Sequence, residues 1–110
     1  MEDCIFCKIV KGEIPAKFVF KGEHIVAFLS IEPLATTHIL IIPKQHIPTF
    51  MDLGNDEIMK EMTNIAHKLI DENKLQNGYK MILNGGIYQR VKHIHWHLLG
   101  GDNLESEVGN

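Results

Sequence analysis

The apolar residues near the N-terminus are spaced as on a helix. Ile5, Phe6 and Ile9 lie at helical intervals, and the polar segment 11–13 follows them. This spacing predicts one or two helical turns. Pro15 prevents the helix from continuing, because its ring lacks a backbone N–H and clashes with the preceding turn.

Extended patterns account for most of the other apolar residues. They predict five strands, at residues 18–20, 25–29, 38–42, 79–83 and 91–99. A Lys-Gly-Glu turn separates the first two strands, which is typical of a hairpin, and a turn at Asn84-Gly85-Gly86 separates the last two.

A change of period marks one long helix between residues 55 and 74. Its apolar positions recur at i, i+4, i+7 and i+11, at Ile58, Met62, Ile65 and Leu69. Such a stripe predicts an amphipathic helix. Asp52 or Asn55 is a candidate N-cap, and Asn73 with Lys74 suits the C-terminal end.

The order of these elements predicts the fold class. Strands that are grouped rather than alternating with helices favour an antiparallel sheet with helices packed against it, an α+β arrangement. The 110 residues, 45% of them apolar and 23% charged, fit one compact domain. We assign residues 1–110 to that domain, with a loose tail from about residue 102.

Composition argues against two classes of partner. The longest apolar run, near residues 39–42, is far shorter than the roughly 20 residues of a membrane span. The net charge of -3 and the pI of 6.1 argue against nucleic acid polymers, whose binding needs a clustered basic face. The N-terminus lacks a basic segment followed by an apolar one, so we expect a cytoplasmic protein.

The last predicted strand carries the most informative chemistry. Alternate side chains of a strand share a face, so three imidazoles are expected on one side, those of His93, His95 and His97. Three interpretations stay open: a solvent-facing polar edge, imidazole ligands of a metal, or one nucleophilic imidazole supported by its neighbours. Asn84 and Gln89 add neutral donors upstream.

Cys4 and Cys7 form a Cys-x-x-Cys pair. In a reducing compartment this spacing indicates either a redox pair or half of a zinc site. The pattern shows no thioredoxin-like βαβ unit around the pair, which favours zinc. Free thiols packed as small apolar residues are the alternative.

The segment from His93 to Leu99 resembles the signature of the histidine triad (HIT) family, in its Hint-like, nucleotide-binding branch. The resemblance runs from Asp3 to Gly101 and includes the segments Cys4-Ile5-Phe6-Cys7-Lys8-Ile9, Gly12-Glu13-Ile14-Pro15, Ala27-Phe28-Leu29, Thr37-His38-Ile39-Leu40-Ile41-Ile42-Pro43 and Lys44-Gln45-His46. It implies the HIT fold, with the sheets of two subunits joined across a homodimer. It also implies hydrolysis or nucleotidyl transfer on purine nucleoside phosphoramidates or small dinucleotides, through a nucleotidyl-histidine intermediate.

The resemblance implies roles for single residues as well. His95 would be the nucleophile, His97 would contact the phosphate and the leaving group, and His38 would support both. Asn84 and Gln89 would lie on the phosphate side. The base would be held by five apolar residues, Ile5, Phe6, Ile9, Phe28 and Ile31. For each of them, ordinary packing in the core is the alternative.

Three features depart from the family pattern. Ser30 stands where an aspartate usually holds the ribose, so a single hydroxyl replaces a carboxylate. Arg90 stands where a serine often meets the phosphate, and the loop at 84–93 is shorter than typical. These departures keep open a nucleotide-binding module with little catalysis.

Some bacterial-type members complete the Cys-x-x-Cys site with two histidines, which correspond here to His46 and His93. Together with Cys4 and Cys7 they would hold a structural zinc that ties the N-terminal turn to the sheet. His93 would then be a brace rather than a catalytic group. A metal-dependent hydrolase with the triad as its ligands is the alternative.

Overall fold

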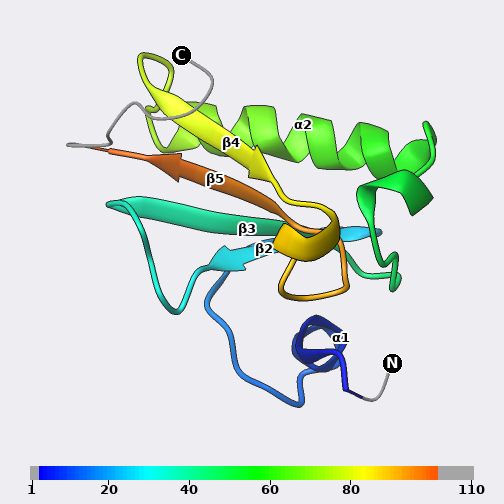
Figure 1. Cartoon of the computed structure of the whole chain (residues 1–110). Coiled ribbons are helices and arrows are strands. Elements are labelled where there is room, and N and C mark those ends of the chain that lie inside the picture. The colour runs from blue at the N-terminus through cyan, green and yellow to red at the C-terminus, as the bar shows by residue number, and fades with distance from the viewer. Residues whose placement is uncertain (1–2, 102–110) are drawn as a thin grey trace.

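The computed structural model describes residues 3–101. Within that range a single sheet has the long helix α2 along one face and the short helix α1 beside the other (Figure 1). In chain order the elements are α1 (Ile5–Val10), β1 (Phe18–Lys21), β2 (Ile25–Leu29), β3 (Thr37–Pro43), the 3-10 helix η1 (Phe50–Asp52), α2 (Glu57–Glu72), β4 (Tyr79–Leu83), the 3-10 helix η2 (Gly86–Tyr88) and β5 (Trp96–Gly100).

The strands of the described range lie in the order β1-β2-β3-β5-β4, and each neighbouring pair is antiparallel. β5 is therefore an inner strand, and His97 lies opposite Leu40 of β3 and Ile82 of β4. β1 and β4 form the two edges. This arrangement confirms the predicted α+β class, with an antiparallel sheet, one short helix and one long helix.

Each face of the sheet has its own core. On one face, α2 packs Met62, Ile65 and Leu69 against β2, β3 and β5, as the apolar stripe predicts. On the other face, α1 packs Phe6 and Ile9 against side chains of β2 and β3. Burying each such side chain contributes about 1.5–3 kcal/mol. No helix among residues 3–101 has the length and apolar character needed to cross a membrane.

The start of α2 corrects the predicted N-cap. Asp56 caps the helix, since its Oδ1 accepts hydrogen bonds from the backbone N–H groups of Ile58 and Met59 at 3.1 and 3.4 Å. Asp52 instead accepts from the backbone and hydroxyl of Thr49, in a capping box that begins η1. The chain turns once through this 3-10 helix before α2 begins, which the periodicity did not indicate.

The C-terminal end of α2 is as predicted. Asn73 is the C-cap, and its backbone N–H bonds to the carbonyl of Leu69. Its side-chain amide donates to the same carbonyl at 2.8 Å. Lys74 follows with φ of 57°, the left-handed conformation that ends many helices.

The last strand is shorter than predicted, and this changes the interpretation of the histidines. β5 begins at Trp96, so His93 and His95 precede the strand, and the prediction that all three histidines lie within one strand is wrong. The backbone N–H of Ile94 donates to the carbonyl of Ile47 at 2.7 Å. This bond ties the segment to the loop after β3 instead of to a strand ladder.

Candidate active site and metal centre

Three imidazoles gather where β3 and β5 lie side by side. His38 is on β3 and His97 on β5, and His38 Nε2 lies 2.9 Å from His97 Nδ1. The ring of His95 follows, with its centroid 5.0 Å from that of His97. Tertiary structure thus brings together the three residues predicted to be catalytic, although they come from a strand, a loop and a second strand.

The hydrogen bond of His95 determines which of its nitrogens can react. Its Nδ1 lies 2.8 Å from the backbone carbonyl oxygen of His93. A carbonyl only accepts, so Nδ1 carries the proton and donates it, and Nε2 of the neutral ring keeps its lone pair. This is the arrangement that an imidazole nucleophile needs.

The surroundings keep these rings neutral. Burial lowers the pKa of His95, against an opposing contribution from its bond to the His93 carbonyl. Burial also lowers the pKa of His38. Burial first, and the neighbouring His95 and His38 second, lower the pKa of His97 to about 4. At neutral pH these three imidazoles are therefore neutral, with one ring proton each.

A second cluster joins α1 to the loops after β3 and before β5. The ligand atoms of its four residues, Cys4, Cys7, His46 and His93, all lie within 4.8 Å of one another. His93 Nδ1 lies 3.3 Å from the sulfur of Cys4 and 3.5 Å from that of Cys7, and His46 Nδ1 lies 3.3 Å from the sulfur of Cys7. The four predicted ligands are thus brought together.

The donor set of this cluster fits a tetrahedral metal. His93 Nε2 lies 2.8 Å from the Pro43 carbonyl and must donate to it, so the bare Nδ1 faces the two sulfurs. Zinc bonds to sulfur and imidazole nitrogen at tetrahedral angles place those atoms about 3.6 Å apart, close to the distances observed. These residues could hold a metal, which would fix α1 to the sheet.

Phe6 links the two clusters. Its ring packs edge-on against the rings of His93 and His95. The distances between ring centroids are 5.8 Å to His93 and 4.9 Å to His95. Of the five apolar residues that the resemblance assigns to the base, Phe6, Ile9 and Phe28 are buried in the core between α1 and the sheet. Ile5 is 38% exposed and Ile31 is 79% exposed.

The polar residues of the predicted phosphate side are not all free to donate. Gln89 is buried, and its amide Nε2 donates to the backbone carbonyls of Pro48 at 2.6 Å and Val91 at 2.9 Å. Asn84 and Ser30 are half-buried. Arg90 is exposed and lines an open cavity of about 480 Å³ beside Cys4 and His46.

Two contacts at the site were missed by the sequence analysis. The backbone N–H of Leu34 donates to His38 Nδ1 at 3.1 Å. The ammonium of Lys92 donates to the carbonyl of Gly86 at 2.9 Å, which ties the segment before β5 to η2. The first involves a main-chain group and the second a flexible lysine, so neither residue type signals its partner.

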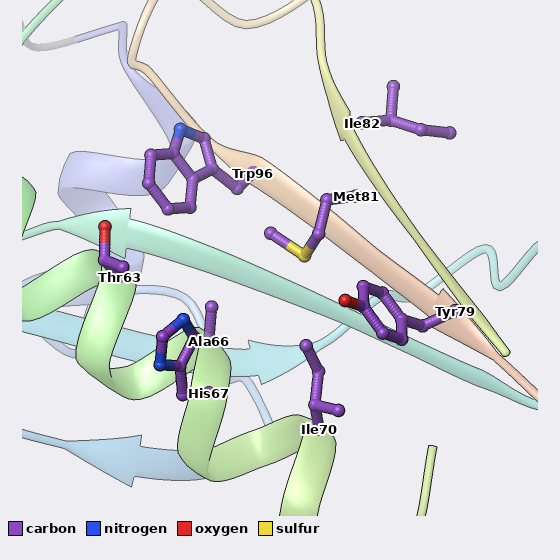
Figure 2. Close-up of a pocket in the computed structure, with 8 residues that line it drawn as sticks. All are labelled: Thr63, Ala66, His67, Ile70, Tyr79, Met81, Ile82 and Trp96. Atoms are coloured by element: carbon purple, nitrogen blue, oxygen red, sulfur yellow. The ribbon is translucent and has the colours of Figure 1, made fainter. Parts of the chain in front are cut away.

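A separate groove of about 310 Å³ lies between α2 and the β4 edge, and its lining does not include His38, His95 or His97. Figure 2 shows helix residues on one side of it and strand residues on the other. Its lining is mostly apolar and consists of Thr63, Ala66, His67, Ile70, Tyr79, Met81, Ile82 and Trp96.

The fold and the site together define a class of protein, a small α+β domain that presents a group of neighbouring imidazoles beside a thiol and imidazole cluster. Comparison with known proteins agrees with this class. The family described as HIT domain matches residues 11–104, and the chain belongs to this family.

Relatives align along nearly the whole chain. The purine nucleoside phosphoramidase of Escherichia coli K12 is 41% identical, covering 94% of this chain and 91% of the relative. The crystal structure of a HIT family hydrolase from Legionella pneumophila has a TM-score of 0.90 and 43% identity, covering 97% of this chain and 100% of that one. A zinc-bound histidine triad family protein from Mycobacterium smegmatis has a TM-score of 0.83 and 29% identity, covering 94% and 81%.

Proposed function

We propose that this protein hydrolyses purine nucleoside phosphoramidates through a nucleotidyl intermediate on His95. The observation that carries the proposal is the bond from His95 Nδ1 to the His93 carbonyl, which leaves Nε2 with a free lone pair. The substrate class is supported by the E. coli relative, which is named for this activity. Small dinucleotides and nucleotidyl transfer fit the same chemistry.

The reaction takes two displacements at phosphorus. In the first, the lone pair of His95 Nε2 forms a bond to phosphorus as the bond from phosphorus to the amine nitrogen breaks, and the departing amine takes up a proton from water. The positive charge that develops on the His95 ring is stabilised by the His93 carbonyl oxygen, which accepts its Nδ1–H.

In the second displacement water attacks phosphorus. The bond to His95 Nε2 breaks, its electron pair returns to the ring, and the proton released from water goes back to solvent. The nucleoside monophosphate then leaves. His97 contributes an N–H donor toward the phosphoryl group in both steps, and His38 supports it through their hydrogen bond of 2.9 Å.

The nucleotide contacts follow from the family pattern. We assign Asn84 and Ser30, both half-buried, to the phosphate and the ribose. Gln89 would act on the phosphate side through the position of its loop, because its amide donors bond to backbone carbonyls. Phe6, Ile9 and Phe28, with the exposed Ile5 and Ile31, are assigned to the base side.

Zinc is the metal that we propose for the four-residue cluster. Two thiols with two imidazoles form a donor set that this ion favours, and the M. smegmatis relative is zinc-bound. Bound there, zinc would supply structural closure between α1 and the loop before β5. Cys4 and Cys7 are free thiols rather than a disulfide, which fits a reducing compartment, so the proposed location is cytoplasmic.

We further propose a homodimer formed through the β4 edge. β4 is an edge strand with unusually exposed apolar side chains: Tyr79 at 48%, Met81 at 37%, Ile82 at 36% and Leu83 at 40%. A long apolar edge of this kind is a liability unless another strand covers it. The groove beside α2 extends the same apolar surface.

A nucleotide-binding module with little turnover is the second candidate. Ser30 at the ribose position and the engaged amide of Gln89 favour it. The structure gives less support to a hydrolase that uses the triad as metal ligands. Within residues 3–101, the group that could hold a metal contains His93 but neither His95 nor His97.

A rapid-quench experiment with adenosine 5'-phosphoramidate tests the proposal. Mass spectrometry should find one adenylyl group per chain on His95 within the first turnovers, and none on His95→Ala. Nucleotide binding without an adduct or product would establish the binding module instead. An adduct on another side chain would overturn the assignment of the nucleophile.

A further inference from the structure

The loop between β2 and β3 folds back onto His38. The backbone N–H of Ser30 donates to the His38 carbonyl at 2.9 Å, and that of Leu34 donates to the His38 ring at Nδ1, at 3.1 Å. His38 is only 5% exposed, whereas Leu34 is 76% exposed. The loop thus reaches the buried ring with a main-chain group while its side chain points to solvent.

This contact determines where the proton of His38 sits. A backbone N–H only donates, so Nδ1 must offer its lone pair, and the proton of the neutral ring is on Nε2. That Nε2–H then donates to His97 Nδ1 at 2.9 Å. His97 consequently carries its own proton on Nε2, the nitrogen that remains for the substrate.

The reverse arrangement is excluded by the same geometry. If His97 Nδ1 donated to His38 Nε2, the proton of neutral His38 would sit on Nδ1 and would face the Leu34 N–H. A doubly protonated His38 meets the same conflict. Burial also opposes the addition of a second proton to either ring. The titratable group next to them is His95, from the loop before β5.

We propose that the main-chain N–H of Leu34 is a positioning group, which sets the tautomers of His38 and His97 so that His97 presents Nε2–H to the phosphoryl group. The inference rests on the proposed function for its use in catalysis, and on the hydrogen-bond geometry alone for the tautomers. It assigns a role to the 30–36 loop that no side chain of the loop reveals.

The first test reads the tautomers directly in the unmodified protein. Long-range proton–nitrogen NMR on chains labelled with ¹⁵N-histidine distinguishes a protonated from a bare ring nitrogen. At pH 7 we expect bare Nδ1 and protonated Nε2 on both His38 and His97. A protonated Nδ1 on His38 would overturn the proposal, whatever the activity of the protein.

The second test removes the donor. Leu34→Pro lacks the N–H, whereas the matched Leu34→Ala keeps it and changes only an exposed side chain. The proline variant should show mixed tautomers at His38 and a kcat roughly tenfold or more below that of the alanine variant, with KM little changed. Unaltered tautomers in a folded proline variant would contradict the proposal.

These readouts separate the inference from the proposed function. If the adduct on His95 is absent but the tautomers are as expected, the proton arrangement stands and the chemistry fails. If the adduct forms but His38 carries its proton on Nδ1, the chemistry stands and the Leu34 inference fails. Should the proline variant not fold, the NMR measurement on the unmodified chain still decides.

Discussion

His93 and His95 are joined by a hydrogen bond of 2.8 Å from the Nδ1 of the second to the carbonyl oxygen of the first. The side chain of His93 faces two thiols of the metal cluster, while its main chain orients the proposed nucleophile. One residue therefore belongs to both sites. The two residues are only two positions apart in sequence, but their rings have different chemistry. The ring of His93 faces sulfur, whereas the ring of His95 lies beside that of His97.

Metal removal should destabilise the fold. A strong chelator is expected to lower Tm by roughly 10 °C or more, because a closed zinc site contributes directly to folding free energy. Elemental analysis should find about one zinc per chain. Cys7→Ala should begin at the lower Tm and respond little to chelator. Immediate loss of activity in a chain that stays folded would indicate a catalytic metal instead.

Stability should fall as the solution is acidified below neutral pH. The folded pKa of His97 is about 4, below the ordinary value of 6.5, so the unfolded chain takes up a proton first as pH falls. The contribution of His97 to the free energy of unfolding is therefore full above about pH 6.5 and is lost progressively toward pH 4. Discounted for partial exposure, the loss at pH 5 is about 1 kcal/mol, or roughly 4–8 °C in Tm.

Thermal unfolding between pH 7 and pH 5 measures this effect. His97→Asn removes the titrating ring, so its Tm should fall less over the same range. An equal slope in both proteins would show that other groups carry the acid sensitivity.

Gln89→Glu should destabilise the protein by about 1–3 kcal/mol, because two backbone carbonyls would then face a carboxylate that cannot donate to them. Urea unfolding measures the loss. Gln89→Met, which removes the amide without adding charge, should cost less. An unchanged stability with a raised KM for substrate would instead support a direct phosphate contact.

Met81→Asp should dissociate the proposed homodimer. In a two-fold symmetric interface the same residue is present on both subunits, so the substitution places two negative charges on an apolar surface. Sedimentation velocity is expected to show monomers at concentrations where the unmodified chain is dimeric. Val19→Asp, at a comparable exposure of 41% on the opposite edge strand β1, should leave the dimer intact. A dimer lost with Val19→Asp alone would place the interface on the other edge.

Local pattern was enough to predict most elements of the fold. The stripe of Met62, Ile65 and Leu69 does pack on the sheet, and β4 spans the predicted residues 79–83. The errors lie where the chain turns. Both 3-10 helices and the true N-cap Asp56 depend on loop geometry, which hydrophobic periodicity does not predict.

The candidate site divides in a similar way. The residue types of the metal cluster were indicated by the Cys-x-x-Cys spacing and by the family resemblance, and all four side chains do converge. The strand placement of His93 and His95 was wrong, because alternation assumes a ladder that the Ile94 bond to the β3 loop replaces. The contribution of Leu34 could not be predicted, since every non-proline residue has the same main-chain N–H.

The sequence by itself determined the elements whose cause is local: helical stripes, extended runs, and the supply of thiols and imidazoles. Tertiary structure decided what those groups do, because hydrogen bonds between distant segments choose the reactive nitrogen. The carbonyl of His93 leaves Nε2 of His95 free, and a loop N–H at Leu34 sets the proton on His38. Such choices depend on directed contacts of a few ångströms, which no periodicity in one dimension encodes.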